Sequence, residues 1–455
     1  MNRRDFIRSS AVLLAGCSTV SDVGVSPTLG GVRKPNIVLI VADDLGYGEL
    51  GAYGGTEIPT PNIDSLADNG VRFTQGYVSC PVCSPTRAGL MTGRYQQRFG
   101  HEFNPGPPEE AEPDFGLPRS ETILPERLKE LGYATGMVGK WHLGFQPELT
   151  PPQRGFDEFF GFLAGSHTYF GNAKGARLLR SATPVRESEY LTDAFAREAV
   201  DFMERHKDEP FFLYLPFNAV HGPLEAEETY LARFPNIEDE KRRTFCAMLS
   251  ALDDAVGQVL SKAGELGLEE NTLIVFISDN GGPTLRTSSG NGPLRGQKSQ
   301  MFEGGIRVPF MMQWKGQMPA GQVYEQPTIS LDIHPTVMAA AGATVEPQWK
   351  LDGVDLFPYL AGSDSGRPHE TLCWRMGERH AIRHGDWKLA VEPAGVAPML
   401  FDLARDREEQ HDLAAEMPTK AEELADLYAA WDSQMEAPRW RGRTPATAVP
   451  RRRQR

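Results

Sequence analysis

The chain has few cysteines, few basic residues and no long apolar run. Five cysteines among 455 residues are too few for a disulfide scaffold. No apolar run reaches the roughly 18 residues that a membrane-spanning helix needs. Acidic residues outnumber basic ones by 61 to 47, which argues against nucleic-acid binding because phosphate binding needs a basic face. With 40% hydrophobic residues the chain can still form a packed core, in one large domain or two smaller ones.

The first residues have the pattern of an export signal. Arg3 and Arg4 form a twin-arginine pair, and a short apolar stretch follows at 11–15. Leu14-Ala15-Gly16-Cys17 then resembles a bacterial lipoprotein box, in which Cys17 would become the lipidated first residue. An accidental small-residue cleavage site is the alternative. We therefore expect an exported protein of the periplasm or cell surface, held to the membrane by a lipid anchor.

Four apolar, β-branched runs are predicted to be strands buried on both faces, at 36–42, 134–138, 211–215 and 272–278. Helical patterns lie between them, at 61–69, 125–131, 193–206 and 241–264. This alternation is typical of an α/β fold with a large, mostly parallel sheet flanked by helices.

The pattern of apolar and polar residues changes from about residue 370. Short strand-like runs and an amphipathic stretch at 419–435 predict a smaller C-terminal α+β subdomain, with a short antiparallel sheet and one helix. The predicted organisation is a signal at 1–17, a tether at 18–32, a large main domain at 33–368, the C-terminal subdomain at 369–437 and a disordered basic tail at 438–455.

Polar residues follow each of the four predicted strands. In strand order they are Asp43 and Asp44; Lys140 and His142; His221; and Asp279 and Asn280. In open α/β sheets, ligands bind outside the carboxyl ends of the strands. The strands are therefore expected to bring these side chains to one edge of the sheet, where the functional site should lie.

A second feature is the segment from Cys80 to Arg87. Pro85 suits the first turn of a helix, so Cys83 is predicted just before a helix N-terminus, where anions bind readily. Arg87 would add a fixed cation one turn later. Cys80 and Cys83 could alternatively form a redox pair or half of a zinc site, but no second cysteine pair exists to complete the zinc site.

This segment resembles the signature of the type I sulfatases of the alkaline-phosphatase superfamily. The pattern is Cys83-x-Pro85-x-Arg87, continued by Ala88-x-Leu90-x-Thr92-Gly93-Arg94. The resemblance covers roughly residues 33–435. The other matching motifs, in order, are Pro35-Asn36-Ile37, Asp43-Asp44-Leu45-Gly46, Gly139-Lys140-Trp141-His142-Leu143-Gly144, His221, Ser278-Asp279-Asn280-Gly281 and Lys298.

The resemblance implies an enzyme that hydrolyses sulfate esters. Cys83 would be oxidised to formylglycine by a formylglycine-generating or equivalent maturation enzyme, and a hydroxyl of the aldehyde hydrate would attack sulfur. The second hydroxyl would then let sulfate leave and restore the aldehyde. One divalent cation would be bound by residue 83 with Asp43, Asp44, Asp279 and Asn280, whose hard oxygen ligands suit Ca²⁺ better than Mg²⁺.

The resemblance also implies roles for five polar side chains. Arg87, Lys140 and Lys298 would hold the sulfate oxygens and offset charge in the transition state. His142 would act as the base on the second hydroxyl. His221, together with Lys298, would be the general acid for the departing alcohol.

The leaving-group pocket is less defined by the sequence. Export favours a sulfated carbohydrate as the substrate, with exo-removal of sulfate and a preference for galactose- or N-acetylgalactosamine-type sugars. An arylsulfatase, a phosphodiester or phosphonate hydrolase of the same superfamily, and a non-catalytic binding protein are the alternatives. The sulfate position, the oligomeric state and the state of the other cysteines stay open. Aromatic and basic candidates for substrate binding are His167, Tyr169, Trp374, Arg375 and His380.

Overall fold

The computed structural model describes residues 34–106, 111–112, 115–171, 177–393 and 395–441. The predicted signal with Cys17, the tether and most of the basic tail lie outside these residues. No helix within the described residues is long and apolar enough to cross a membrane. The described residues belong to one compact unit, which contains both predicted sheets.

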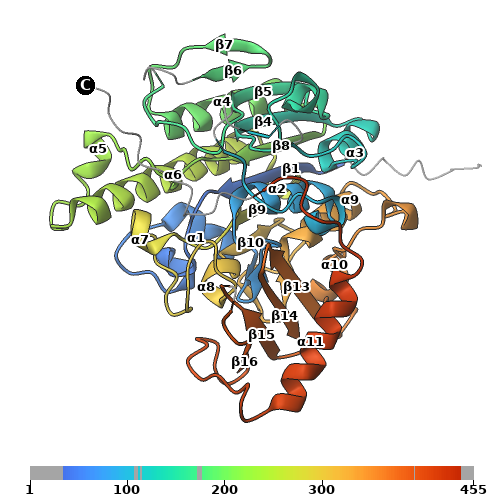
Figure 1. The fold of residues 1–455 in the computed structure, drawn as a ribbon. Helices are drawn as coiled ribbons and strands as arrows, with labels where there is room; N and C mark the ends of the chain where they lie inside the picture. Colours follow the sequence, from blue (N-terminus) through green and yellow to red (C-terminus); the bar gives the residue numbers. More distant parts are fainter. Residues whose placement is uncertain (1–33, 107–110, 113–114, 172–176, 394, 442–455) are drawn as a thin grey trace, which may run out of the picture. The chain divides into compact units, whose positions relative to one another are not determined.

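The main sheet has ten strands within the described residues, in the order β11-β2-β10-β9-β1-β8-β4-β5-β6-β7 (Figure 1). The five central strands β9, β1, β8, β4 and β5 are parallel to one another, and antiparallel pairing begins at β10 on one side and at β6 on the other. The strands are β1 Asn36–Ala42, β2 Val71–Phe73, β4 Ala134–Lys140, β5 Glu158–Phe162, β6 Leu178–Arg180, β7 Thr183–Val185, β8 Phe211–Pro216, β9 Thr272–Ser278, β10 Phe310–Gln313 and β11 Gln322–Tyr324.

The four predicted strands are confirmed as β1, β4, β8 and β9. They are neighbours in the sheet, in the order β9-β1-β8-β4, and all run in the same direction. Their carboxyl ends therefore meet at one edge, as the sequence predicts. The sheet is mixed only at its margins, where shorter strands carry weaker sequence signals.

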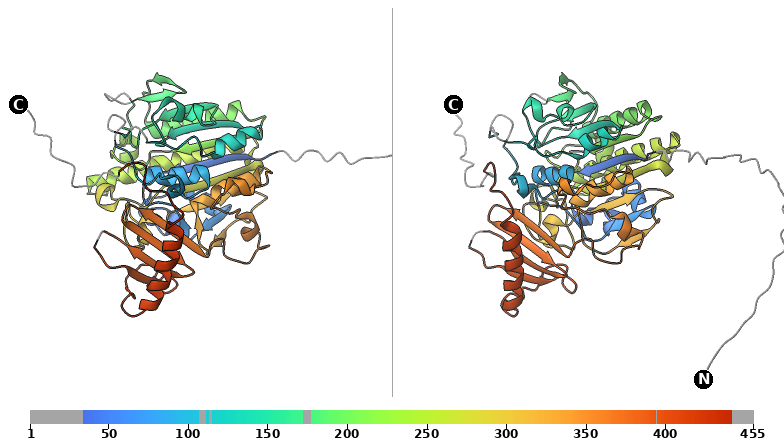
Figure 2. Two further views of the ribbon diagram at one scale, coloured as in Figure 1. Left: turned by 45° about the vertical axis from the view of Figure 1, so that its right-hand side comes forward. Right: turned by 90° about the vertical axis from the view of Figure 1, so that its right-hand side faces the viewer.

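Both faces of the central strands are buried, because helices cover each side of the sheet. In β1 the side chains of Ile37, Leu39 and Val41 enter one apolar core, whereas Val38 and Ile40 enter another. The first core contains residues of α2, α3 and α9, and the second contains residues of α1, α4 and α6 (Figures 1 and 2). A continuous apolar run is thus required, rather than an alternating one.

The predicted helices are confirmed within one or two residues at most ends. The helices are α1 Pro61–Asp68, α2 Cys83–Thr92, α3 Leu124–Glu130, α4 Leu191–Arg205, α5 Glu228–Leu231, α6 Glu240–Glu265, α7 Thr284–Thr287, α8 Glu303–Ile306, α9 Ile333–Ala340, α10 Phe357–Leu360 and α11 Pro418–Asp432. Pro61 is at the start of α1, where its missing N–H costs nothing because the first turn has no intrahelical partner for it.

The C-terminal region forms a four-stranded antiparallel sheet with one helix, as predicted. One face of the sheet packs on α11 through Ile382, Leu389 and Leu424, and the other face joins the main core through Trp374 and Phe401. The strands are β13 Thr371–Met376, β14 Arg379–His384, β15 Trp387–Val391 and β16 Met399–Asp402, and a separate pair is formed by β3 Gly76–Tyr77 and β12 Thr328–Ile329.

The predicted disordered tail starts too early. Trp440 is 3% exposed, and its indole N–H donates to the carbonyl oxygen of Phe103 at 2.9 Å. Its ring also packs edge-on against His101 and Phe115. A single aromatic residue in an otherwise polar segment thus anchors the chain at least as far as this position, which periodicity could not reveal.

Candidate active site

The turn after β1 carries two adjacent aspartates. The backbone N–H of Asp43 donates to Ala219, and its carbonyl oxygen accepts from Val220, so the turn is fixed to the loop after β8. Asp44 has a φ of 63°, and its N–H donates to Oδ1 of Asp279 at 3.2 Å. These contacts join the ends of three neighbouring strands, and they direct both carboxylates to the edge of the sheet.

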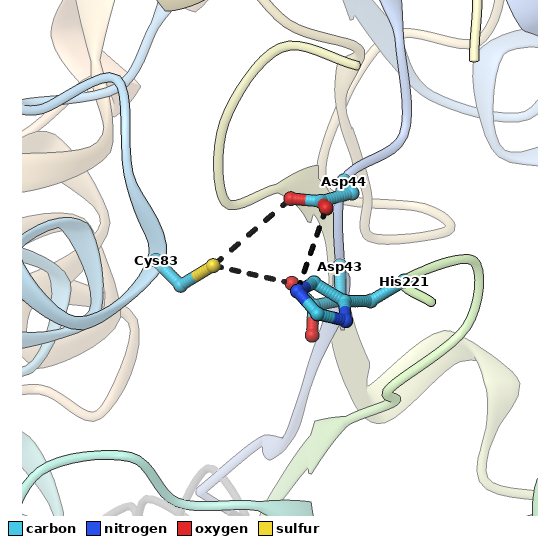
Figure 3. Close-up of side chains that lie close together, drawn as sticks. All are labelled: Asp43, Asp44, Cys83 and His221. Carbon is cyan, nitrogen blue, oxygen red and sulfur yellow. Dashed lines mark hydrogen bonds and ion pairs between the residues drawn. The ribbon is translucent and has the colours of Figure 1, made fainter. Parts of the chain in front are cut away.

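Cys83 lies opposite these aspartates. It is the first residue of α2 rather than the residue before it, since Val82 caps the helix in an extended conformation. Its Sγ is 3.5 Å from Oδ1 of Asp43 and 3.1 Å from Nζ of Lys298. Figure 3 shows the thiol pointing toward Asp43 and Asp44, with His221 beside them.

Three cations lie against the three buried carboxylates. Lys140 Nζ is 2.6 Å from Asp43, and Lys298 contacts Asp44. Arg87 donates through Nε and Nη2 to Oδ2 of Asp279, at 3.0 and 2.8 Å, and through Nη1 to the carbonyl oxygen of Lys140. The charges of these six side chains cancel when all are ionised. An added divalent cation would therefore leave the site positive, as binding of an anion requires.

The carboxylates of the cluster differ in their affinity for protons. Burial and the neighbouring charge of Asp43 raise the pKa of Asp279 to about 6. Burial alone would also raise the pKa of Asp43, but Lys140, His221 and Arg87 hold it well below its usual range. Asp43 is thus ionised at neutral pH, and further positive charge near Asp279 would favour its ionised form as well.

The donor set fits a divalent cation. One ligand atom from each of Asp43, Asp44, Cys83 and His221 lies within 4.8 Å of the others. Asn280 donates its amide N–H to Oδ1 of Asp44 at 2.7 Å, while its own Oδ1 is buried without a hydrogen-bond partner among the described residues. A buried oxygen left over beside carboxylates is a ready ligand for a hard cation such as Ca²⁺ or Mg²⁺.

Two histidines border this cluster. His142 is buried with a φ of 62°, and burial together with Lys140 lowers its pKa, so its imidazole is neutral. His221 has Nδ1 2.6 Å from the carbonyl oxygen of Gly222 and Nε2 3.6 Å from Asp44. Burial lowers the pKa of His221 as well, although Asp44 and Asp43 oppose this shift. Nε2 of His221 is left to face a ligand.

A cavity of about 880 Å³ opens beside Cys83. Its wall is made by the loop after β5, by β6 and β7, by the loop at 104–106 and by α7. The residues that line it and are used below are Cys83, Asn104, His142, Phe162, Gly165, His167, Arg177, His221 and Arg286.

Of the predicted substrate-binding residues, His167 lines this cavity and Tyr169 does not. Nδ1 of His167 is 2.6 Å from the carbonyl oxygen of Thr168, and its Nε2 is buried without a described partner. Tyr169 is fully buried, and its hydroxyl donates to the carbonyl oxygens of Asn218 and His221. Tyr169 therefore supports the loop that carries His221 rather than contacting a ligand.

The three predicted residues of the C-terminal subdomain do not line this cavity. Trp374 is fully buried, and its indole N–H donates to Val78 at 2.6 Å. Arg375 is paired with Glu102 and Asp432. The ring of His380 stacks on Tyr428, with 4.2 Å between the ring centroids. Their strands, β13 and β14, are covered by the core on one face and by α11 on the other, and none of the three residues lines the cavity.

Sequence reasoning missed three polar residues on the cavity wall. Asn104 lines the cavity and also accepts the backbone N–H of Ser84 at 2.9 Å. Arg177 and Arg286 lie in short segments before β6 and in α7. Neither arginine belongs to a motif, and only the fold brings these segments together. The four cysteines within the described residues are free thiols.

Comparisons with known proteins agree with this geometry. A family model described as sulfatase matches residues 35–343. Human arylsulfatase A is 36% identical over 443 residues, which cover 84% of this chain and 83% of the human protein. The N-acetylgalactosamine-6-sulfatase of Canis lupus familiaris is 36% identical over 390 residues, covering 79% of this chain and 72% of that protein. The crystal structure of Ps i-CgsB in complex with k-i-k-neocarrahexaose has a TM-score of 0.86 at 37% identity, covering 90% of this chain and 96% of that one.

Proposed function

The chain belongs to the sulfatase family and hydrolyses sulfate esters, and we propose that it removes sulfate from carbohydrates, using formylglycine made from Cys83 and one bound Ca²⁺. The observation that carries the proposal is the position of residue 83. It starts α2 at the inner end of the cavity, and its side chain contacts Asp43 and Lys298. A nucleophile there would face a ligand in the cavity and the proposed ion at once.

An unmodified cysteine is a poor nucleophile in this position. Burial and the charge of Asp279 raise the pKa of the Cys83 thiol to about 12, so the thiol stays protonated at neutral pH. Formylglycine does not need a deprotonated thiol, because its hydrate presents hydroxyl groups in place of the thiol. The surroundings of residue 83 therefore favour the modified form as the working group.

The polar side chains then take distinct roles. Lys140 and Lys298 bind the sulfate oxygens. Arg87 uses three of its five N–H groups on Asp279 and the Lys140 carbonyl oxygen. Arg87 therefore positions those two residues, and its other N–H groups can help to hold the sulfate. A Ca²⁺ ion held by Asp43, Asp44, Asp279, Asn280 and residue 83 supplies Lewis-acid stabilisation of negative charge on the sulfate ester.

The two histidines act at either side of the nucleophile. The neutral imidazole of His142 accepts a proton from the hydroxyl group of residue 83 that is left after sulfate transfer. His221 presents Nε2 to the ester oxygen and, when protonated, donates to the departing alcohol. Both rings line the cavity, as these roles require.

A carbohydrate substrate is supported by the cavity and by the relatives. The cavity can accommodate a sugar ring, and its wall mixes the aromatic ring of Phe162 with polar groups such as Asn104 and His167. One relative is named as an N-acetylgalactosamine-6-sulfatase, and another was solved with k-i-k-neocarrahexaose. An aryl sulfate is the second candidate, because arylsulfatase A is equally similar in sequence.

The test measures sulfate released from a panel of sulfated mono- and oligosaccharides and from an aryl sulfate. The protein is produced with a formylglycine-generating enzyme, and the tryptic peptide containing residue 83 is checked by mass spectrometry for the change from cysteine to formylglycine. Sulfate release from sugars that disappears in Cys83→Ala supports the proposal. Turnover of the aryl sulfate alone contradicts the proposal that the substrate is a carbohydrate. Full activity of Cys83→Ala contradicts the assignment of residue 83 as the nucleophile.

We also propose export and lipid anchoring through Cys17. The twin-arginine pattern and the lipoprotein-like box support this assignment. Expression of the full chain with a labelled fatty acid in a bacterial host tests it. Label in wild type but not in Cys17→Ala supports the anchor, whereas unlabelled wild-type protein in the periplasm contradicts it while leaving export intact.

A further inference from the structure

The wall of the cavity beside Cys83 differs in charge from the protein as a whole. The full chain carries a net charge of −14, yet none of the 18 described residues that line the cavity is Asp or Glu. Arg177, Arg286 and three histidines lie on the wall instead. A concave wall without acidic side chains concentrates positive potential, and it therefore favours an anionic ligand.

Arg177 and Arg286 are both free to bind such a ligand. Each is exposed, and neither side chain makes an ion pair or a hydrogen bond with a residue that the structure describes. Other exposed arginines behave differently: Arg180 is paired with Glu198, and Arg233 is paired with Asp254. A free guanidinium in a cavity suits planar or tetrahedral anions, because it can donate two parallel hydrogen bonds to their oxygens.

These two arginines are not needed for the sulfate group that is cleaved. That group is served at Cys83 by Lys140 and Lys298, which contact Asp43 and Asp44 rather than the outer wall. Arg177 directly precedes β6, and Arg286 lies in α7, and Figure 1 shows these two elements well apart. The arginines thus lie at separate positions around the cavity, where they would meet other parts of an extended substrate.

Building on the proposed function, we propose that the substrate is an oligosaccharide with at least one further anionic group, and that Arg286 and Arg177 each provide a binding position for such a group. The group is a sulfate or a carboxylate, which share the required oxygen geometry. His167 lines the same cavity. Its Nδ1 faces a carbonyl oxygen and so carries the proton, which leaves the partnerless Nε2 to accept a sugar hydroxyl.

The experiment compares three galactose-containing disaccharides with the same cleavable sulfate. One has no other charge, one carries a second sulfate, and one carries a uronic acid carboxylate on the neighbouring sugar. Wild type, Arg286→Ala, Arg177→Ala and the double variant are assayed for kcat/KM. Arg407→Ala is the matched control, because Arg407 is also exposed but does not line the cavity.

We expect wild type to prefer a doubly anionic disaccharide. Loss of one charge-assisted contact should lower kcat/KM for that substrate by about tenfold, with little change for the singly sulfated one and none for Arg407→Ala. Preference for the second sulfate or for the carboxylate identifies the source of the anion. Equal losses on all three disaccharides, or no loss, would overturn the inference while leaving the proposed function in place. Wild type without activity on any disaccharide, but active on an aryl sulfate, would overturn both.

Discussion

The hydroxyl of Ser84 donates a hydrogen bond of 2.7 Å to the carbonyl oxygen of His142. Ser84 follows the nucleophile position directly, and His142 has a left-handed backbone conformation that costs a non-glycine residue roughly 1–2 kcal/mol. His101 also lies against the same hydroxyl, with Nε2 at 2.7 Å. The bond therefore ties the start of α2 to the strained turn that carries the proposed base.

Replacing Ser84 by alanine should lower activity without unfolding the protein. Loss of one buried hydrogen bond, worth about 0.5–1.5 kcal/mol, corresponds to a fall in kcat of up to about tenfold with KM nearly unchanged. Ser84→Thr, which keeps the hydroxyl, should recover most of the activity. Thr92→Ala removes a hydroxyl at the other end of α2 and is the control for general helix damage. Equal kcat values for Ser84→Ala and wild type would show that the hydrogen bond between Ser84 and His142 is not needed for catalysis.

Gly165 leaves no room for a side chain next to His142. A Cβ atom at this position would lie 2.5 Å from Nε2 of His142, although the backbone there does not require glycine. Gly165→Ala should therefore displace the imidazole and reduce kcat by about tenfold or more, as loss of a positioned general base does. Gly264→Ala, where the added methyl would make an ordinary contact at 3.4 Å, is the control. Steady-state kinetics with both variants separates this local displacement from a change in fold.

The sequence predicted the inner part of the site better than its outer part. Asp43, Lys140, His221 and Asp279 each end or follow a buried strand, and the apolar pattern of those strands is strong enough to predict their shared edge. The outer wall comes instead from loops and from the short strands β6 and β7, which have no comparable pattern.

The failures have a common physical cause. Trp374 and Arg375 are aromatic and basic, as sugar-binding residues often are, but the same properties serve burial and ion pairing. Whether such a side chain faces a cavity or a core depends on contacts between distant segments. Arg286 gave no signal for the opposite reason, because an isolated exposed arginine in a short helix looks like ordinary surface. Single-sequence patterns do not contain this information.

Asn280 should contribute to metal affinity through its partnerless Oδ1. We expect Ca²⁺ to raise the melting temperature of wild type and EDTA to abolish turnover, since an ion at about 100 times its Kd stabilises the folded state by about 2.7 kcal/mol. Asn280→Ala should need more Ca²⁺ for the same thermal shift. Asn69→Ala, which lies on the exposed end of α1, is the control. An unchanged Ca²⁺ titration of Asn280→Ala would remove Asn280 from the ligand set.

Asp193 should make stability depend on pH. Its carboxylate accepts the hydroxyl of Tyr230 at 2.8 Å, and burial raises its pKa from 3.8 to about 6. The folded state thus holds this proton more tightly than the unfolded state, so the stabilisation is present below about pH 4 and is lost as the pH rises through about 6. The neutral variant Asp193→Asn should lack this loss.

Thermal unfolding from pH 4 to pH 8 measures the effect as the difference between variant and wild type. We expect Asp193→Asn to gain stability relative to wild type across this range. Asp201→Asn, at an exposed position of the same helix, should show a flat difference. A flat difference for Asp193→Asn as well would mean that its carboxyl group is solvated in solution.

Lys388 joins the C-terminal sheet to the catalytic core. Its ammonium group is fully buried between two carboxylates, 2.9 Å from Glu303 and 2.8 Å from Glu409. Lys388→Met removes the only positive charge that contacts the Glu409 carboxylate among the described residues, and it leaves two acids facing each other in the core. Breaking such a buried group should cost about 3–5 kcal/mol of unfolding free energy, measured by urea denaturation.

Lys420→Met, which breaks a surface pair with Glu423, should cost no more than about 0.5 kcal/mol. Because β15 carries Lys388 and Glu303 starts α8, a larger loss at Lys388 would show that this contact between the C-terminal sheet and the rest of the protein contributes to stability. Similar small losses in both variants would mean that the buried charges are compensated elsewhere.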